Sequence, residues 1–355
     1  MRVCGFLLAM ATLVLQPAIA QDTFKLPCID KDKACASRAI QNHAVRKLDS
    51  WNAALSMPVD QRMAPASPQL VEYLNLDNIL NGLSERPRAA RLDVAFLADV
   101  KAAIADLPPE IWRLFSERFL GLYFVENLGG TGYTDFVMNR DGKPVAGYIV
   151  LDAGILVQQT ANGWATWKEN TPFKVQTAYT LVARMETDAN NSRKNAIQYI
   201  LLHELGHLLS IGGNIHPPWN IFPKDVPAGV AYPFFERSWT INRQANKYRS
   251  LFDADFPQRT DVRYYFGARL PGDEMVHVYA NVEKTDYPSL YAATSPGDDF
   301  AESFASYVHV VLMRRPWQIT ISKYGEALKV FRPCWDEPRC APKRKILEEI
   351  LRRPA

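Results

Sequence analysis

The segment His203-Glu204-Leu205-Gly206-His207 constrains this chain more than any other. It lies in a run with apolar residues at helical spacing, residues 195–211. Residues four apart on an α-helix share a face, so His203 and His207 can bind one metal ion together. Glu204 lies about 100° further round the helix, where its carboxylate can act as a general base on a metal-bound water. This pattern predicts a buried helix that carries a zinc site.

Two histidines and a glutamate are costly to bury without a metal ion or hydrogen-bond partners. The alternative to a zinc site is therefore a buried helix whose histidines only make hydrogen bonds. Gly206 costs about 1 kcal/mol inside a helix. Its small size leaves room for another backbone or a metal-bound ligand to approach closely.

A catalytic zinc site needs a third protein ligand and one open position. In metzincins that ligand follows as H-E-x-x-H-x-x-G-x-x-H, but Ser210 and Gly213 stand at the required Gly and His positions, which excludes this arrangement. His216 lies between Gly212-Gly213 and Pro217-Pro218, and it has no recognised ligand spacing. We therefore look further along the chain for the third ligand.

Residues 291–307 carry two carboxylates with helical spacing. Pro296-Gly297 interrupts the chain, and Asp298 and Asp299 suit a helix start, as cap and first-turn acids. Asp298 and Glu302 are four apart and share a face. One carboxylate can bind zinc while the other orients a histidine ligand from behind. The alternative is a capping Asp and a solvated Glu without a metal.

The H-E-x-x-H helix followed by Tyr291-x6-Asp298-x-Phe-Ala-Glu302-x-Phe resembles the gluzincin metallopeptidases typified by the anthrax lethal factor catalytic domain and the Pro-Pro endopeptidases. The resemblance rests on two motifs and covers residues 120–315. It implies a zincin-like domain in which Asp298 is the third ligand, Tyr291 stabilises the oxyanion and Glu302 supports a ligand from behind. The family has Glu where this chain has Asp298, which is one methylene shorter. Either the second helix lies closer to the metal, or Glu302 becomes the ligand.

Residues 1–20 have the pattern of a secretory signal peptide. Arg2 precedes an apolar run, residues 4–15, that is too short to span a membrane, and Ala18-Ile19-Ala20 is a cleavage site. An uncleaved N-terminal anchor is the alternative. The rest of the sequence has no run of about 20 apolar residues. We therefore expect a secreted or periplasmic protein with no stable membrane insertion after signal cleavage.

Four cysteines follow Cys4, and an even number in an exported chain predicts disulfides. Three pairings are open. We favour Cys28–Cys35 and Cys334–Cys340, because each pair closes a short polar or proline-containing loop. Neither spacing is typical of a four-cysteine zinc site.

The distribution of charge argues against a nucleic-acid partner. The formal net charge is only +3, and basic residues gather only in residues 342–353, beside Glu348 and Glu349 on an expected helix. This pattern indicates a solvated helix face, so we expect no nucleic-acid partner. The expected partner is a peptide or protein substrate, and the oligomeric state is left open.

The sequence pattern changes from helical to extended near residue 118. Apolar stripes predict an N-terminal helical module over residues 21–117, either a separate domain or a layer packed on the next one. Residues 121–125, 133–138 and 146–151 predict strands, with a hairpin between the last two. A zincin-like metallopeptidase domain then covers residues 118–330, and a disulfide loop and helix cover residues 331–355. The expected fold class is α+β and mostly helical, with a small mixed sheet.

Three further segments bear on the cleft. In gluzincins an edge strand pairs with extended substrate, and residues 146–151 are our candidate for that edge. Residues 213–235 form a proline-rich aromatic loop that either walls the cleft or packs on the core. Residues 240–256 are expected to be helical.

Together these features predict an exported zinc-dependent endopeptidase with one Zn²⁺ held by His203, His207 and Asp298. Glu204 would be the general base, and Tyr291 would donate a hydrogen bond to the developing oxyanion. Two alternatives remain. One is a zinc-binding regulatory protein without activity, which the Asp in place of Glu suggests but Glu204 and Tyr291 argue against. The other is a cell-wall peptide amidase with the same zinc chemistry.

Overall fold

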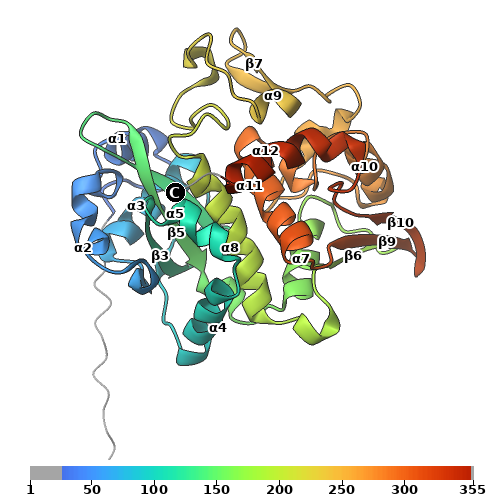
Figure 1. The fold of residues 1–355 in the computed structure, drawn as a ribbon, viewed down its shortest axis with the longest axis horizontal. Helices are drawn as coiled ribbons and strands as arrows, with labels where there is room; N and C mark the ends of the chain where they lie inside the picture. The colour runs from blue at the N-terminus through green and yellow to red at the C-terminus, as the bar shows by residue number, and fades with distance from the viewer. Residues whose placement is uncertain (1–25, 353–355) are drawn as a thin grey trace, which may run out of the picture.

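A mixed five-stranded sheet organises the computed structural model, which describes residues 26–352 (Figure 1). The expected signal peptide, residues 1–20, lies outside these residues. The parallel pair β3 and β5 forms the middle of the sheet, and β4 pairs antiparallel with β5. Two short strands, β1 and β2, both pair with β3. The bounds are β1 (Met63–Pro65), β2 (Arg88–Ala89), β3 (Phe119–Glu126), β4 (Gly132–Met138) and β5 (Pro144–Asp152). The three expected strands and the β4–β5 hairpin are thus confirmed.

β5 is not an edge strand, so the expectation that residues 146–151 form the edge is wrong. β4 lies at one end of the sheet, and among the described residues its outer edge is free apart from one bridge between Met138 and Lys47. β5 lies between β3 and β4. Its side chains fill the cores on both faces of the sheet, with Ile149 and Leu151 on one face and Tyr148 and Val150 on the other. A strand buried on both faces has a continuous apolar sequence, which is what residues 146–151 show.

Helices cover both faces of the sheet (Figure 1). One face packs against α1 and α3, and the other face packs against α4, α5 and α8. The bounds are α1 (Lys33–Gln41), α2 (Asn52–Leu55), α3 (Pro68–Asn81), α4 (Val94–Ala105), α5 (Pro109–Phe115), α6 (Ala153–Leu156), α7 (Ala161–Asn170) and α8 (Arg193–Ser210). Residues 26–117 therefore contribute two short strands to the sheet as well as helices to both of its faces.

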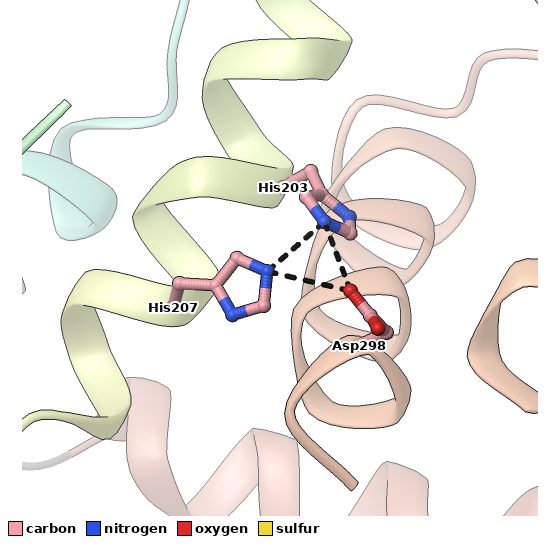
Figure 2. Close-up of side chains that lie close together, drawn as sticks. All are labelled: His203, His207 and Asp298. Atoms are coloured by element: carbon pink, nitrogen blue, oxygen red, sulfur yellow. Dashed lines mark hydrogen bonds and ion pairs between the residues drawn. The ribbon is translucent and has the colours of Figure 1, made fainter. Parts of the chain in front are cut away.

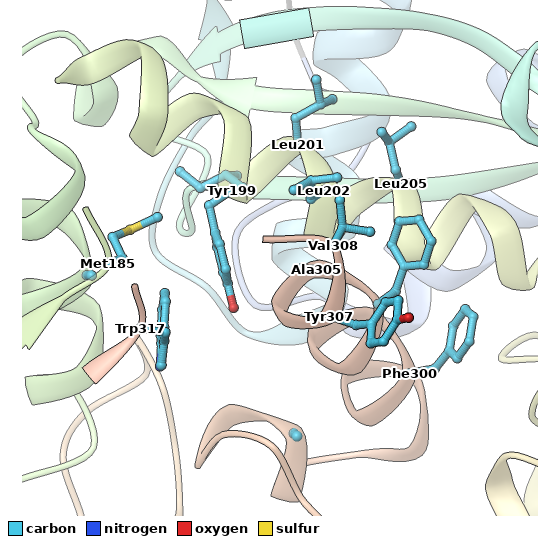
Figure 3. Close-up of a cluster of buried hydrophobic side chains, with 14 of the residues drawn as sticks. Met185, Tyr199, Leu201, Leu202, Leu205, Phe300, Ala305, Tyr307, Val308 and Trp317 are labelled. Carbon is cyan, nitrogen blue, oxygen red and sulfur yellow. The ribbon is translucent and has the colours of Figure 1, made fainter. Parts of the chain in front are cut away.

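The remaining part of the chain packs against α8 through α11. Figure 3 shows the apolar side chains between these two helices, among them Leu202 and Leu205 from α8 and Phe300 from α11. A second, antiparallel sheet has the strand order β10-β9-β6. The bounds are β6 (Tyr179–Arg184), α9 (Phe235–Ser238), α10 (Met275–Val282), α11 (Pro296–Tyr307), β9 (Gln318–Lys323), β10 (Glu326–Phe331) and α12 (Ala341–Arg352). The fold is thus α+β and rich in helix, as expected.

Residues 240–256 do not form the expected helix. They contain most of an antiparallel hairpin, β7 (Trp239–Asn242) and β8 (Lys247–Ser250), followed by turns. The two asparagines explain the difference. Asn242 Oδ1 accepts a hydrogen bond of 2.9 Å from the Ala245 amide, and Asn246 adopts a φ of 49°. Asparagine tolerates this left-handed conformation and stabilises turns in competition with a helix.

Both favoured disulfides are present. Cys28 bonds to Cys35 and Cys334 bonds to Cys340, with Cα atoms 5.7 and 5.6 Å apart, which is the usual Cα separation across a disulfide. The first closes a loop at the start of α1, and the second closes the loop before α12. Within residues 26–352, no helix combines the length and apolar character needed to cross a membrane.

Candidate metal centre

The two histidines of the H-E-x-x-H segment project from one face of α8 toward α11 (Figure 2). α8 is 18 residues long and buried along most of its length, because apolar side chains surround the motif on every other face. The helical spacing brings His203 Nε2 and His207 Nε2 within 3.1 Å of each other. The two nitrogen atoms are thus close enough to bind one metal ion, as the sequence predicted.

The Asp298 carboxylate, at the start of α11, lies next to these two nitrogen atoms. Ser295, rather than Asp298, caps this helix, because its Oγ accepts from the Asp298 amide at 3.1 Å and Pro296 occupies the first turn. The expectation of Asp298 as cap was therefore wrong, and Asp298 lies in the first turn. Its Oδ2 accepts hydrogen bonds from Ser295 Oγ at 2.7 Å and Thr294 Oγ1 at 3.0 Å. These bonds orient the carboxylate so that Oδ1 faces the histidines.

The three donor atoms fit one metal ion. Asp298 Oδ1 lies 3.9 Å from His203 Nε2 and 3.6 Å from His207 Nε2. With the 3.1 Å between the two nitrogens, the circle through all three atoms has a radius of about 2.1 Å. Zinc bonds to nitrogen and carboxylate oxygen are about 2.0–2.2 Å long. His203, His207 and Asp298 are therefore a candidate metal-binding triad of the right size.

A close approach of α8 and α11 explains why an aspartate suffices. A Cβ atom at Gly206 would lie 2.7 Å from the Ala301 Cα atom and 3.2 Å from the Ala301 carbonyl oxygen. Only glycine fits there, so the expectation that Gly206 admits another backbone is confirmed. Because α11 lies this close, the shorter Asp298 side chain reaches the histidines.

Glu302 lies behind His203 rather than in the triad. Its Oε1 is 3.1 Å from His203 Nδ1, in ion-pair contact outside ideal hydrogen-bond alignment. The side chain is 1% exposed, so it is not a solvated Glu. Ser289 Oγ donates to Oε2 at 2.8 Å, and Lys168 Nζ donates to Oε1 at 3.0 Å. A carboxylate behind a histidine fixes the ring orientation in many metal sites.

Charges within the centre favour ionised carboxylates. Burial raises the pKa of Asp298, but the two histidines outweigh it and the pKa is lowered. Burial lowers the pKa of His207, but Asp298 and Glu204 outweigh it and the pKa is raised. Burial also raises the pKa of Glu302, yet Lys168 and His203 together outweigh burial, so the pKa is lowered. A metal ion competes with the proton that this cluster holds, so its binding weakens in acid.

Glu204 lies against the free edge of the main sheet. Its Oε2 accepts a hydrogen bond of 2.7 Å from Thr134 Oγ1 on β4. A Cβ atom at Gly132 would overlap the Glu204 carboxylate, so β4 comes this close only because residue 132 is glycine. The carboxylate thus has a fixed orientation beside the triad and lines the same cleft.

Tyr291 completes the group of expected site residues. Its ring lies against His203, with centroids 5.3 Å apart, and it borders the cleft. Burial raises the pKa of Tyr291 well above its ordinary value, with a further contribution from Asp298. The phenol therefore keeps its proton at neutral pH and is a hydrogen-bond donor.

The triad opens into a cleft of about 690 Å³. One wall is β4, and another comes from the 213–235 loop through Trp219 and Phe222, whose side chain is 66% exposed. Tyr232 and Phe234 of the same loop are buried in the core, so the loop both walls the cleft and packs on the core. A second hollow of about 760 Å³ adjoins the first at Tyr133 and Tyr291. The two hollows share Gly132, Tyr133 and Tyr291 as lining residues, so they are continuous with each other.

The other histidines stay outside the triad. His216 lines the cleft, but its Nδ1 lies 2.8 Å from the Pro217 carbonyl oxygen, and burial lowers its pKa to about 4. His309 is buried with its Nε2 2.8 Å from the Met185 carbonyl oxygen. The sequence did not point to Thr134, Ser295 or Lys168 as site residues. Ser295 alone had a local signal, since Ser before Pro marks a helix start.

No family model, curated protein or solved structure matches this chain in the comparisons with known proteins. The function proposed below therefore rests on the geometry of this chain's own residues.

Proposed function

We propose that this protein is an exported zinc-dependent endopeptidase. The single observation that carries the proposal is the convergence of the triad, Glu204 and Tyr291 on one cleft beside a free strand edge. The triad alone supports metal binding. A carboxylate and a protonated phenol beside it add the two groups that amide hydrolysis needs.

Zinc is the proposed metal because of the donor set. Two imidazole nitrogens and one carboxylate oxygen are a common protein ligand set for catalytic zinc, which keeps its fourth position for water. When bound, zinc would lower the pKa of that water and polarise the substrate carbonyl. Asp298 is the proposed third ligand, and Glu302 is the proposed partner behind His203.

Glu204 would move the proton in this reaction. Its carboxylate, held by Thr134, accepts a proton from the attacking water and returns it to the leaving amine. Tyr291 donates a hydrogen bond to the carbonyl oxygen as negative charge develops there. The free edge of β4 offers backbone groups that can pair with an extended peptide across the scissile bond. The two adjoining hollows support cleavage within a chain rather than at its end.

The observations weaken the non-catalytic alternative. Its motive was the Asp in place of Glu, and the close approach of α8 and α11 gives that change a structural reason. A protein that only retained zinc would have no need for Glu204 and Tyr291 beside an open cleft. Export is supported by the N-terminal sequence pattern and by the two disulfides, which form in oxidising compartments.

A comparison of the wild-type protein with Glu204→Gln tests the proposal. Both proteins are loaded with zinc and incubated with a peptide library and, separately, with purified peptidoglycan, and the products are identified by mass spectrometry. We expect new peptide termini with the wild-type protein only, while both proteins hold one zinc. Equal cleavage by both proteins would refute the role of Glu204. Zinc binding without cleavage of either substrate would favour the regulatory alternative, and cleavage of peptidoglycan alone would favour the amidase.

A further inference from the structure

A fully buried lysine lies next to the candidate metal centre, on the side of Glu302. Lys168, on α7, is 1% exposed, and its Nζ atom is surrounded by aromatic rings. The nearest is Tyr291, whose ring centroid is 4.6 Å from Nζ, and Trp164 and Tyr264 follow at 5.6 Å. Burying an ammonium group costs several kcal/mol unless other charges compensate it. Such a residue is expected only where its charge has a partner.

The partner of Lys168 is the carboxylate behind the zinc ligand. Lys168 Nζ lies 3.0 Å from Glu302 Oε1, and the same oxygen lies 3.1 Å from His203 Nδ1. Glu169 Oε1 is further from Nζ, at 3.5 Å. A continuous line of contacts therefore runs from Lys168 through Glu302 to His203, whose other nitrogen belongs to the triad. The Tyr291 ring lies against both His203 and Lys168.

We propose that Lys168 is a positioning residue of the metal centre. Its ammonium group holds the Glu302 carboxylate against His203 Nδ1 and packs against the ring of Tyr291. This inference rests on the metal site of the proposed function. Without Lys168, Glu302 would keep a buried negative charge, and apart from His203 itself its contacts would be those with Ser289 and Tyr199. His203 would then lose the fixed partner that sets its ring orientation and tautomer.

The chain offers a matched control in Lys343. This lysine is also fully buried, and its Nζ lies 2.7 and 2.8 Å from the two oxygens of Asp299. Asp299 follows Asp298 on α11, but none of its contacts is with the triad. Aromatic rings also surround Lys343, with Tyr287 at 4.8 Å. The two lysines thus make the same kind of buried ion pair with the same helix, and only one pair touches a zinc ligand.

The test compares Lys168→Met with Lys343→Met. The zinc affinity of the metal-free proteins is measured by competition with a chelator, and their unfolding temperatures are measured without metal. We expect both variants to unfold at lower temperature, because each leaves a buried carboxylate unpaired. Only Lys168→Met should also bind zinc about 10–100-fold more weakly. Wild-type zinc affinity in Lys168→Met, or equal weakening in both variants, would overturn the inference.

A second variant keeps the test decisive if Lys168→Met does not fold. In Lys168→Met combined with Glu302→Gln, the ion pair between these two side chains is removed as a whole, and the buried Glu169 keeps its hydrogen bonds from Tyr264 and Tyr279. We expect the double variant to bind zinc as Glu302→Gln alone does, because Lys168 acts through Glu302. A further tenfold loss in the double variant would contradict this. Absence of zinc binding in the wild-type protein would overturn the proposed metal site itself, together with this inference.

Discussion

The close contact between α8 and α11 makes Gly206→Ala a sharp perturbation of the metal centre. The added Cβ atom would lie 2.7 Å from the Ala301 Cα atom. Two carbon atoms prefer a separation of about 3.5–4.0 Å, so the helices must move apart by about 1 Å. Asp298 lies three residues before Ala301 and moves with α11.

That displacement is large on the scale of the triad. The separations of 3.9 and 3.6 Å between Asp298 Oδ1 and the two histidine nitrogens would grow toward about 4.5–5 Å. Ligands of a tetrahedral zinc ion lie about 3.4 Å apart. We therefore expect Gly206→Ala to bind zinc about 100-fold more weakly, since Asp298 would no longer reach the position where it and both histidines bind one ion.

The stability and the zinc affinity of Gly206→Ala together distinguish a steric effect at Ala301 from an effect of helix propensity. Propensity alone predicts that Gly206→Ala stabilises the helix by about 1 kcal/mol, whereas overpacking costs about 1–3 kcal/mol. Zinc affinity would be measured by chelator competition and stability by thermal unfolding of the metal-free protein. Gly213→Ala is the control, because its Cβ atom would meet nothing closer than 3.7 Å and should leave affinity unchanged. A higher unfolding temperature with unaltered zinc affinity in Gly206→Ala would show that the contact with Ala301 does not set the position of Asp298.

Three further predictions concern the ligand, the cleft and the response to acid. Asp298→Ala should purify almost free of zinc, while Glu302→Gln still fills at high zinc; near-stoichiometric zinc in Asp298→Ala by elemental analysis would eliminate it as ligand. Phe222→Ala should raise KM for peptides about tenfold with little change in kcat, because a substrate covers this exposed ring; unchanged steady-state kinetics would contradict the apolar wall. Burial lowers the pKa of His309 from 6.5 to about 4, so the unfolded state binds a proton at this histidine at a higher pH than the folded state does. The free energy of unfolding should therefore fall by about 3 kcal/mol as the pH falls from 6.5 to 4. Denaturant unfolding of His309→Gln should show a smaller loss over this range, and an identical loss would disprove the assignment.

Local geometry made much of the site predictable from the sequence. The spacing of His203 and His207 decides that they share a helix face, whatever the rest of the fold does. The two short cysteine loops are also local relations, whereas the roles of Tyr291 and Asp298 came from the resemblance of their spacing to a known family. Fold class followed from the strand and helix periodicities of individual segments. The histidine pair, the cysteine loops and the fold class needed only neighbouring residues.

Relations between distant segments were not predictable. The order of strands, which makes β4 the edge, depends on which segments pair and not on the sequence of β5 alone. Lys168 lies 134 residues from Glu302, and its neighbours Trp167 and Glu169 give no sign that it is buried. The choice between Asp298 and Glu302 depended on the distance between α8 and α11, which the Gly206 contact sets. The β7–β8 hairpin was missed because two asparagines outweighed a weak helical pattern.

Titration of the metal-free protein with zinc shows whether peptide hydrolysis depends on a single bound metal ion. Peptide hydrolysis is followed at each addition, with bound zinc measured in the same samples. Activity should be absent without metal and should rise in proportion to bound zinc until one equivalent is bound by His203, His207 and Asp298. Undiminished hydrolysis after metal removal, or a full equivalent of bound zinc with no hydrolysis, would contradict a one-zinc peptidase.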